Sequence, residues 1–594
     1  MSSLARFTAH DSAESADDSI RAADSVAGGS PTALDDRPTL VSSPESRRRG
    51  LLVSAAITLL VLIPFLGKPF HVDDPLFIWT AEQIRKSPVD FYGFALNWYG
   101  FEQDMAEVTK NPPGLSYVLA VTSLFVGLSE WAVHAVLLLP AVGLTCGTYL
   151  VAARYTHRPL LASLLSIATP AWLVSATTAM CDITMLCLWV WAVYFWLAGL
   201  DRRHFGLLLA AGACMAAAAL TKYFAISLVP LLGLVALARR RQRYECFIAL
   251  LIPIFALVLL DIYTTFKYHR GIVRDTLSYV DFYQGRVSID RWTQLRLGLS
   301  FLGGSVATLL FFLPRILGWQ GRLTLAGVAT MLTAALIHNG DFVGMPINTD
   351  QGRDWGALLH VMLFLLAAVE VVALVVLELG RRRDEGSLLL VAWIAGTWVF
   401  SSYLNWAVNV RTLLPLVPPL AILVARRIDE AEPCSSSDRP AWRDAIPLSL
   451  ALGVALLVSW GDFRFAVAQR QLARAALEKT ANTPGHVYFQ GHWGFQYYIQ
   501  RGGAIALKLD SEIVFTRDVM IVPMNNSNIN LLPENLVEVR DRALAPLASP
   551  AVTISPQQGA GFYFGHRDVP LPWRLVWAPD EEVRIYGFLA SFEL

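Results

Sequence analysis

Ionisable and aromatic side chains are concentrated in one stretch of an otherwise apolar chain, from His71 to Tyr117. Its sequence is HVDDPLFIWTAEQIRKSPVDFYGFALNWYGFEQDMAEVTKNPPGLSY, and it follows the first long apolar run. Acidic pairs, one lysine and amphipathic aromatic residues suit a reaction site at the surface of a bilayer. We therefore predict that this stretch is the catalytic loop of a membrane enzyme. The residues that carry this prediction are Asp73, Asp74, Glu107, Lys110, Trp98 and Tyr99.

Asp73 and Asp74 are the candidate general bases. A carboxylate that is partly desolvated at the edge of a bilayer has a raised pKa, which suits it to remove a proton. Asp followed by Asp-Pro is also a signal for the start of a helix, with proline at the first helical position. Capping is therefore an alternative role, and both roles can coexist.

Lys110 precedes Asn111, Pro112 and Pro113, and the prolines should end any preceding helix and direct the chain toward the membrane. At that level its ammonium group could bind a lipid phosphate. Alternatively, it could extend along the apolar surface to the headgroups. Glu107 lies three residues earlier, so helical spacing would allow an ion pair with Lys110.

Three charged residues farther along the chain are also candidates. Asp182 and Lys222 each stand between apolar runs. An ionisable group at the centre of a membrane helix costs about 2.5–3.5 kcal/mol and usually faces protein or water, although at a helix end it could simply lie in the interface. Arg411 precedes an apolar run, where it could bind a phosphate or carboxylate as a fork or serve as an anchor. His269 could complete a metal site with Glu107 or Asp73, although a lone histidine is more often not a ligand.

Composition indicates an integral membrane protein. Of 594 residues, 55% are hydrophobic and only 16% are charged, whereas soluble domains carry roughly 25% charged residues. The formal net charge is zero, which gives no support for a nucleic-acid partner. There is no Walker loop, GxGxxG, HExxH or GxSxG motif, so nucleotide-driven and common hydrolase chemistries are unsupported.

Basic clusters next to the apolar runs define an expected topology. Residues 1–46 are predicted to be a disordered cytoplasmic tail, because they are too polar to bury a core. Arg47–Arg49 then place the N-terminus in the cytoplasm, and thirteen spans between 47 and 460 put every later arginine cluster on the same side. A further run, 113–128, would reverse this order if it crossed, so we predict that it is juxtamembrane or re-entrant. The alternative is that it crosses and another short run does not.

The remaining residues, 461–594, are less apolar and predict a small soluble α/β domain on the periplasmic face. Strand-like segments occur at 486–490, 504–509 and 518–523, and a helical segment occurs at 494–500. The predicted architecture is therefore a polytopic α-helical membrane domain with a catalytic outer loop at 67–131, followed by this domain.

The chain resembles the lipid-linked glycosyltransferases of the GT-C fold. The similarity is greatest to the bacterial branch that is like dolichyl-phosphate-mannose-protein mannosyltransferases and related to the aminoarabinose transferases of lipid A. Four segments carry the resemblance: HVDDPLFIWTAEQI, EVTKNPPGLSYVL, ALTKYFAISLVPLLGLVAL and NVRTLLPLVPPLAIL. They span about residues 51–425, and the first two together are the more specific.

The resemblance implies inverting transfer of a sugar from a polyprenyl-phosphate carrier to a lipid, polysaccharide or protein acceptor in the periplasm, by an enzyme of the bacterial inner membrane. It implies a catalytic or acceptor-orienting role for Asp73 and places Asp74 on the second acidic position. It also implies that Lys110 contacts the carrier phosphate, and it matches Asp182 and Arg411 to family positions. Thr109 stands where the family often has Glu, which leaves a divalent metal as an open question.

Positive groups would receive the charge of the leaving phosphate, and the candidates for this role are Lys110, Lys222 and Arg411. Aromatic residues of the outer loop, including Trp98 and Tyr99, could stack on sugar or isoprene units. A transporter or flippase of a lipid-linked sugar is the main alternative, and a non-catalytic assembly protein is a third. No inverted repeat is evident in the sequence, which weakens the transporter alternative.

Overall fold

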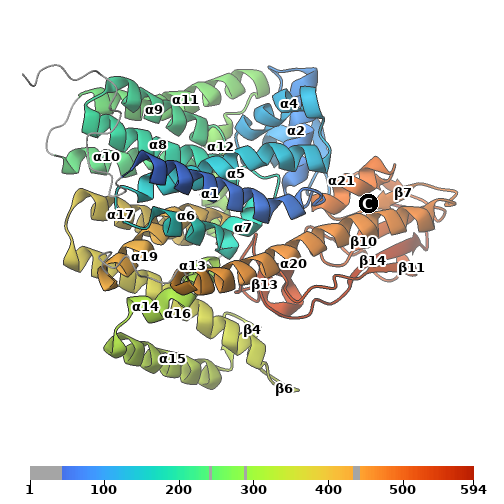
Figure 1. Cartoon of the computed structure of the whole chain (residues 1–594). Coiled ribbons are helices and arrows are strands. Elements are labelled where there is room, and N and C mark those ends of the chain that lie inside the picture. The colour runs from blue at the N-terminus through green and yellow to red at the C-terminus, as the bar shows by residue number, and fades with distance from the viewer. Residues whose placement is uncertain (1–42, 240–243, 287–289, 433–441) are drawn as a thin grey trace, which may run out of the picture. The chain divides into compact units, whose positions relative to one another are not determined.

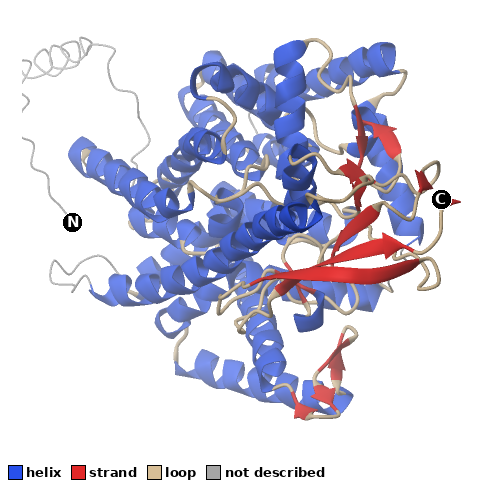
Figure 2. Ribbon diagram, turned by 90° about the vertical axis from the view of Figure 1, so that its right-hand side faces the viewer, coloured by secondary structure: helices blue, strands red, loops and turns tan. Residues whose placement is uncertain are grey.

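The structure is a computed structural model that describes residues 43–239, 244–286, 290–432 and 442–594, with side chains described for all of these except 281–286. Helices make up most of this part, and a sheet formed late in the chain lies beside them (Figures 1 and 2). Of the predicted tail 1–46, residues 1–42 lie outside the described residues. Helix α1 (Pro44–Leu62) begins within the tail's last residues, because the Ser43 side chain caps it by accepting from the backbone N–H of Ser46.

Nine helices in the described ranges are long and apolar enough to cross a membrane. Several include a short 3-10 or π-helical continuation. They are α1 with η1 (Pro44–Phe65), α5 (Glu130–Ala152), α8 (Asp182–Arg202), α11 (Tyr244–Tyr268), α13 continuing to α14 (Arg291–Ile316), α15 (Trp319–Asn339), α16 (Trp355–Arg381), α17 with η4 (Glu385–Leu404) and α20 (Trp442–Thr480).

Helices α6 (Pro159–Ile167) and α7 (Pro170–Ala176) form a broken span with a bend of 65°. Pro170 causes the break, because it lacks a backbone N–H and disfavours helical geometry at the residue before it. Thr169 accordingly adopts an extended conformation and caps the new helix, accepting from the backbone N–H of Trp172.

The predicted polytopic helical fold is confirmed, but several of the thirteen expected spans are short. The bent pair, α9 (Phe205–Ala219), η2 with α10 (Tyr223–Ala238) and α19 (Val417–Ala431) correspond to the expected spans that are not among the nine long helices. The run predicted to be juxtamembrane is α4 (Gly114–Val126), which has 13 residues. This is less than the ~20 residues that a full span requires.

The C-terminal residues form a five-stranded sheet in the order β11-β14-β10-β7-β8. Strands β7 (Val487–Phe489), β8 (Ile505–Ala506) and β10 (Val519–Pro523) are parallel, and helix α21 (Trp493–Arg501) connects β7 to β8. Strand β14 (Glu581–Phe588) pairs antiparallel with β10, and the edge strand β11 (Val537–Ala545) pairs antiparallel with β14. All five residues of β10 are buried, as expected for a central strand covered on both faces.

Helix α20 joins the apolar part of the chain to the sheet. It runs without a break for 39 residues across position 460, the expected domain boundary. Leu472 and Ala476 near its end share a hydrophobic core with Ile521 and Ile585 of the sheet, and the same core includes Phe77 of helix α2 (Asp74–Lys86). The first loop (residues 67–131) therefore packs against the C-terminal sheet.

Between β11 and β14 the chain makes an excursion, residues 546–580, whose middle part packs among the helices. Phe562, Leu571 and Trp573 belong to the core of the helical region. The Trp573 indole N–H donates to the carbonyl of Gly304, at 2.8 Å, and the Ser300 hydroxyl donates to the carbonyl of Pro570, at 2.7 Å. We call this segment the C-terminal excursion.

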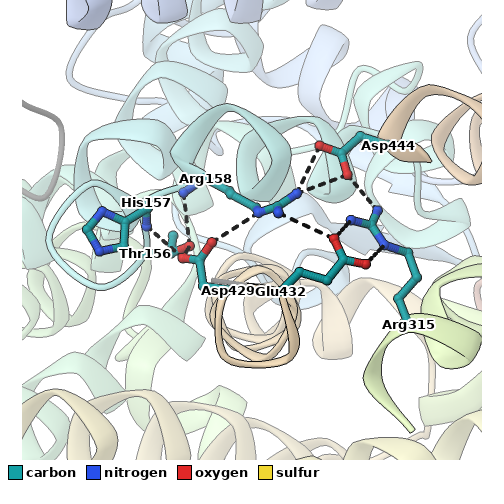
Figure 3. Close-up of polar contacts among 7 residues, drawn as sticks. All are labelled: Thr156, His157, Arg158, Arg315, Asp429, Glu432 and Asp444. Carbon is teal, nitrogen blue, oxygen red and sulfur yellow. Dashed lines mark hydrogen bonds and ion pairs between the residues drawn. The ribbon is translucent and has the colours of Figure 1, made fainter. Parts of the chain in front are cut away.

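A network of ion pairs joins four helices at one end of the bundle (Figure 3). Arg158, at the N-cap of α6, binds Asp429 of α19 at 3.0 Å and Asp444 of α20 at 3.2 Å. Arg315 of α14 (Leu313–Ile316) binds the same Asp444, and both arginines contact Glu432. Arginine clusters predicted to share one side of the membrane thus meet, and which side this is stays a prediction.

Candidate functional site

Four charged residues from distant parts of the chain form a continuous chain of ion pairs. Arg411, in the short helix α18 (Val410–Leu413), donates from Nη1 to Oδ2 of Asp73 and from Nε to Oδ2 of Asp182, both at 2.9 Å. The Lys222 ammonium binds Oδ1 of the same Asp182, at 2.5 Å. The structure thus brings together Asp73, Arg411, Asp182 and Lys222, which the sequence analysis selected separately.

These residues lie at helix ends. Asp182 is the first residue of α8, and Lys222 immediately precedes η2 (Tyr223–Ser227). At the other end of α8, Asp201 pairs with Arg154 and Arg239. Because a 21-residue helix is about 30 Å long, these two ionic groups lie at opposite ends of the bundle.

Asp73 is the most accessible carboxylate of this site. Its side chain is 33% exposed, compared with 1% for Asp182. Although Asp73 occupies the N-cap position of α2, its side chain makes no capping hydrogen bond. Arg411 binds Oδ2, and among the described residues no hydrogen bond reaches Oδ1. One oxygen of Asp73 is therefore available to a ligand.

Asp74 is fully buried and has a different environment. Its two oxygens accept from the backbone N–H groups of His71, at 3.0 Å, and Ala179, at 2.9 Å. Burial raises the pKa of Asp74 to about 7, although both hydrogen bonds oppose the shift. Asp74 thus links the first loop to the turn before α8, and this geometry suits a structural role.

The backbone between the two acids and His71 is strained. Val72 has φ of +49°, in the left-handed region that a β-branched residue rarely adopts. This turn lets the backbone N–H of His71 reach the carboxylate of Asp74 three residues later. Strain of this kind persists only where surrounding contacts hold it, and it is often found at functional sites.

The segment that carries Lys110 packs against the turns that hold Asp182 and Lys222. The backbone N–H of Gly114 donates to the carbonyl of Leu220, at 2.9 Å, and the Cys181 thiol contacts the side-chain oxygen of Asn111, at 3.7 Å. The ammonium of Lys110 itself donates to the carbonyl of Glu107, at 2.6 Å.

Lys110 is also covered by helix α12 (Ile272–Arg286). Its ammonium lies 3.7 Å from Asp275 and 4.8 Å from the centre of the Tyr279 ring. Burial lowers the pKa of Lys110, and the neighbouring Asp275 opposes this shift. A carboxylate thus stands where an anionic ligand of Lys110 would bind.

The metal site considered for Glu107 and His269 does not have a matching set of ligands. Glu107 pairs with Arg270, at 3.0 Å, and accepts from Gln103. Within the described residues, no three His, Cys, Asp or Glu side chains are grouped so that they could hold a metal ion. The described residues therefore offer no set of side chains that fits a metal ion.

Trp98 packs inside the protein. Its ring meets Trp79 edge-on, at 6.3 Å, and stacks on His492 of the C-terminal part, at 5.2 Å. Trp98 is 6% exposed, whereas Tyr99 is half-buried. Stacking of Trp98 and Tyr99 on a substrate stays a prediction.

A second group of polar residues, which we did not predict from the sequence, lies next to Asp73. The Lys68 ammonium pairs with Asp462 of α20, at 2.5 Å, and Asp462 also binds His71, at 3.1 Å. The Tyr563 hydroxyl donates to Asp462, at 2.8 Å, and Thr553 donates to its other oxygen, at 2.7 Å. We call these five residues the buried polar cluster. The available signal was Asp462 itself, an acid within a long apolar helix.

Fold and site together define a polytopic membrane protein with an ionic site at one end of its helix bundle. Residues 110–263 match the sequence model of a family described as "Dolichyl-phosphate-mannose-protein mannosyltransferase". This match confirms the predicted resemblance over the segment that contains Lys110, Asp182 and Lys222. No curated protein sequence matches the chain.

Solved structures with a similar fold share 14% sequence identity with the chain. One is the oligosaccharyltransferase AglB from Archaeoglobus fulgidus in complex with an inhibitory peptide and a dolichol-phosphate, with a TM-score of 0.44 over 78% of this chain. This chain spans 64% of the length of AglB. Another is ArnT from Cupriavidus metallidurans bound to undecaprenyl phosphate, with a TM-score of 0.38 over 80% of this chain and 93% of ArnT.

Proposed function

We propose that the chain is a membrane glycosyltransferase that moves a sugar from a polyprenyl-phosphate donor to an acceptor hydroxyl on the periplasmic face, with inversion at the anomeric carbon. The observation that carries the proposal is the accessible Asp73 carboxylate, which Arg411 holds beside Asp182 and Lys222. The family match over residues 110–263 supports the class of donor.

In the proposed reaction, the hydroxyl oxygen of the acceptor attacks the anomeric carbon of the donor sugar. Asp73 accepts the proton that this hydroxyl loses. The bond from that carbon to the phosphate oxygen breaks, and its electron pair leaves with the polyprenyl phosphate. Attack opposite the leaving group inverts the configuration. A positioned base of this kind contributes roughly 10²–10⁴-fold to a rate.

Arg411 would orient the base, because binding one oxygen of Asp73 fixes the carboxylate and directs the other oxygen toward the acceptor. Lys110 would bind the donor phosphate and stabilise the charge that it gains in the transition state. For this to occur, Asp275 must give up its place beside the Lys110 ammonium. Lys222 would act through Asp182, by fixing the carboxylate that holds Arg411.

The test is sugar transfer by the purified protein in lipid vesicles, with a panel of radiolabelled undecaprenyl-phosphate and dolichyl-phosphate sugars. Asp73→Asn should reduce transfer by roughly 10²-fold or more. Asp104→Asn is the matched control, because Asp104 is an exposed acid in the same loop. Transfer by Asp73→Asn at the wild-type rate would refute the role of Asp73.

A transporter or flippase of a lipid-linked sugar is the second candidate, and one observation favours it. Glu370 is buried near the middle of α16, and its Oε1 has no hydrogen-bond partner among the described residues. Ionisable residues at such positions often mark transport pathways. Movement of a fluorescent lipid-linked sugar across vesicles without any labelled product would favour this candidate over the enzyme.

A further inference from the structure

The buried polar cluster connects the C-terminal excursion to the acidic motif (residues 71–74). Lys68, His71 and Asp462 have no exposed side-chain surface. Buried charges are costly unless they are paired and hydrogen-bonded, and removing one partner exposes that cost. A cluster of this kind is therefore a point where the position of one segment depends strongly on another.

Tyr563 stands at the centre of this connection. Its hydroxyl donates to Asp462 and lies 3.0 Å from Nε2 of His71. Its ring meets the His71 ring edge-on, at 5.3 Å, and the Arg411 guanidinium lies 6.0 Å from the ring centre. One side chain of the excursion thus contacts both the acidic motif and the arginine that binds Asp73.

The excursion is seated closely enough to place Tyr563 accurately. The backbone N–H of Val410 donates to the carbonyl of Phe562, at 3.1 Å, and Gly565 donates to Val408, at 2.8 Å, so the excursion pairs with the chain on either side of Asn409. On α20, a Cβ at Gly461 would stand 2.3 Å from the carbonyl oxygen of Ala551. Only glycine therefore allows the excursion to approach α20 beside Asp462.

The acidic motif needs such support because its backbone is strained at Val72. The Asp74 carboxylate holds one side of the strained turn, and the His71 side chain holds the other. If His71 were released, the turn could relax and carry Asp73 away from Arg411.

We infer that Tyr563 and Asp462 are positioning residues: they lock His71 so that the strained acidic motif presents Asp73 to Arg411 and to the acceptor. On this inference, the C-terminal excursion contributes to the site by positioning the acidic motif. The inference rests on the proposed function, and it extends that function to residues more than 380 positions away from Asp73.

The test uses the full-length protein in detergent and in vesicles. Tyr563→Phe removes only the hydroxyl, and Tyr488→Phe is the matched control, because Tyr488 is a buried tyrosine of β7 whose hydroxyl donates to Glu512 at 3.0 Å. Hydrogen–deuterium exchange of the peptide covering residues 66–80 reports on the motif, since the backbone N–H groups of Lys68, His71 and Asp74 are all hydrogen-bonded there. Thermal unfolding of each variant shows whether the fold is kept.

We expect Tyr563→Phe to speed exchange in this peptide by roughly tenfold or more and to lower kcat for transfer by a similar factor, with the KM for the donor unchanged. Thr553→Val should act in the same direction more weakly, and Tyr488→Phe should change neither quantity. Equal exchange and equal kcat in Tyr563→Phe and Tyr488→Phe would overturn the inference. If the wild type transfers no sugar from any donor, the proposed function fails, and the exchange comparison still decides whether Tyr563 positions the motif.

Discussion

The guanidinium of Arg411 lies 2.9 Å from Oδ2 of Asp73, although 338 positions separate the two residues. A second donor of the same guanidinium binds Asp182 at the start of α8. Arginine is suited to this position because its planar fork presents several donors in a fixed geometry, so one side chain can hold two carboxylates at once. The orientation of the candidate base therefore depends on the shape of this side chain as well as on its charge.

Replacing Arg411 by lysine separates shape from charge. A single ammonium group cannot keep both hydrogen bonds, so we expect transfer to fall by roughly tenfold or more. The matched control is Arg426→Lys, because Arg426 is a buried arginine of α19 that also binds two carboxylates, those of Glu378 and Asp384. Steady-state kinetics in vesicles would measure both variants, and a similar loss of activity in each would show that the effect is not specific to the site.

Asp74 gives the stability of the protein a defined dependence on pH. Its pKa is 3.8 for the free side chain and about 7 in the folded protein. Between these values the folded protein keeps a proton that the unfolded protein loses, so the free energy of unfolding falls as the pH rises through this window. At about 1.4 kcal/mol per pH unit, the loss amounts to roughly 4 kcal/mol when complete.

Thermal unfolding of wild type and Asp74→Asn between pH 5 and pH 8 measures this contribution. The wild type should lose stability relative to the variant as the pH rises, and the difference should become constant above the folded pKa of about 7. Parallel curves for the two proteins would show that Asp74 does not titrate in this range.

Lys110 and Asp275 should have opposite effects on donor binding. Lys110→Ala removes the proposed phosphate-binding group and should weaken the binding of undecaprenyl phosphate by roughly tenfold. Asp275→Asn removes a competing carboxylate 3.7 Å away and should tighten binding several-fold. The affinity of both variants for undecaprenyl phosphate would be measured in detergent. The control is Lys86→Ala, because Lys86 is an exposed lysine of the same loop. Weaker binding in Asp275→Asn would contradict the proposed competition.

The sequence was sufficient for the parts of the fold that depend on local pattern. Long apolar runs located the membrane helices, strand-like segments located β7 and β10, and a helical segment located α21. Asp73, Asp182, Lys222 and Arg411 were candidate site residues because they lie next to apolar runs. Ionisable groups are rare at such positions and need a partner. Which of them pair with one another depends on how helices pack, and local pattern does not specify this.

The path of the C-terminal excursion could not be predicted for the same reason. Residues such as Phe562 and Trp573 give an ordinary irregular pattern, and nothing local shows that they enter the core of the helical region. Lys68 and Asp462 lie 394 positions apart, so neither residue alone indicates a buried pair. The bent pair α6 and α7 is an intermediate case, because Pro170 signals a break but not its direction.

The ion-pair network of Arg158 and Arg315 should stabilise the fold without affecting transfer. Arg158 lies within bonding distance of Asp429, Glu432 and Asp444, and its side chain is only 13% exposed. Arg158→Ala leaves these carboxylates with fewer partners and should lower the free energy of unfolding by about 2 kcal/mol, the value typical of a hydrogen bond to a charged group. Arg381→Ala is the control: its side chain is 60% exposed and pairs with Glu430, so the expected loss is about 0–1 kcal/mol. Thermal unfolding and transfer rates would be measured on the same preparations. A fall in transfer by folded Arg158→Ala protein would contradict the prediction and would mean that the two ends of the bundle are coupled.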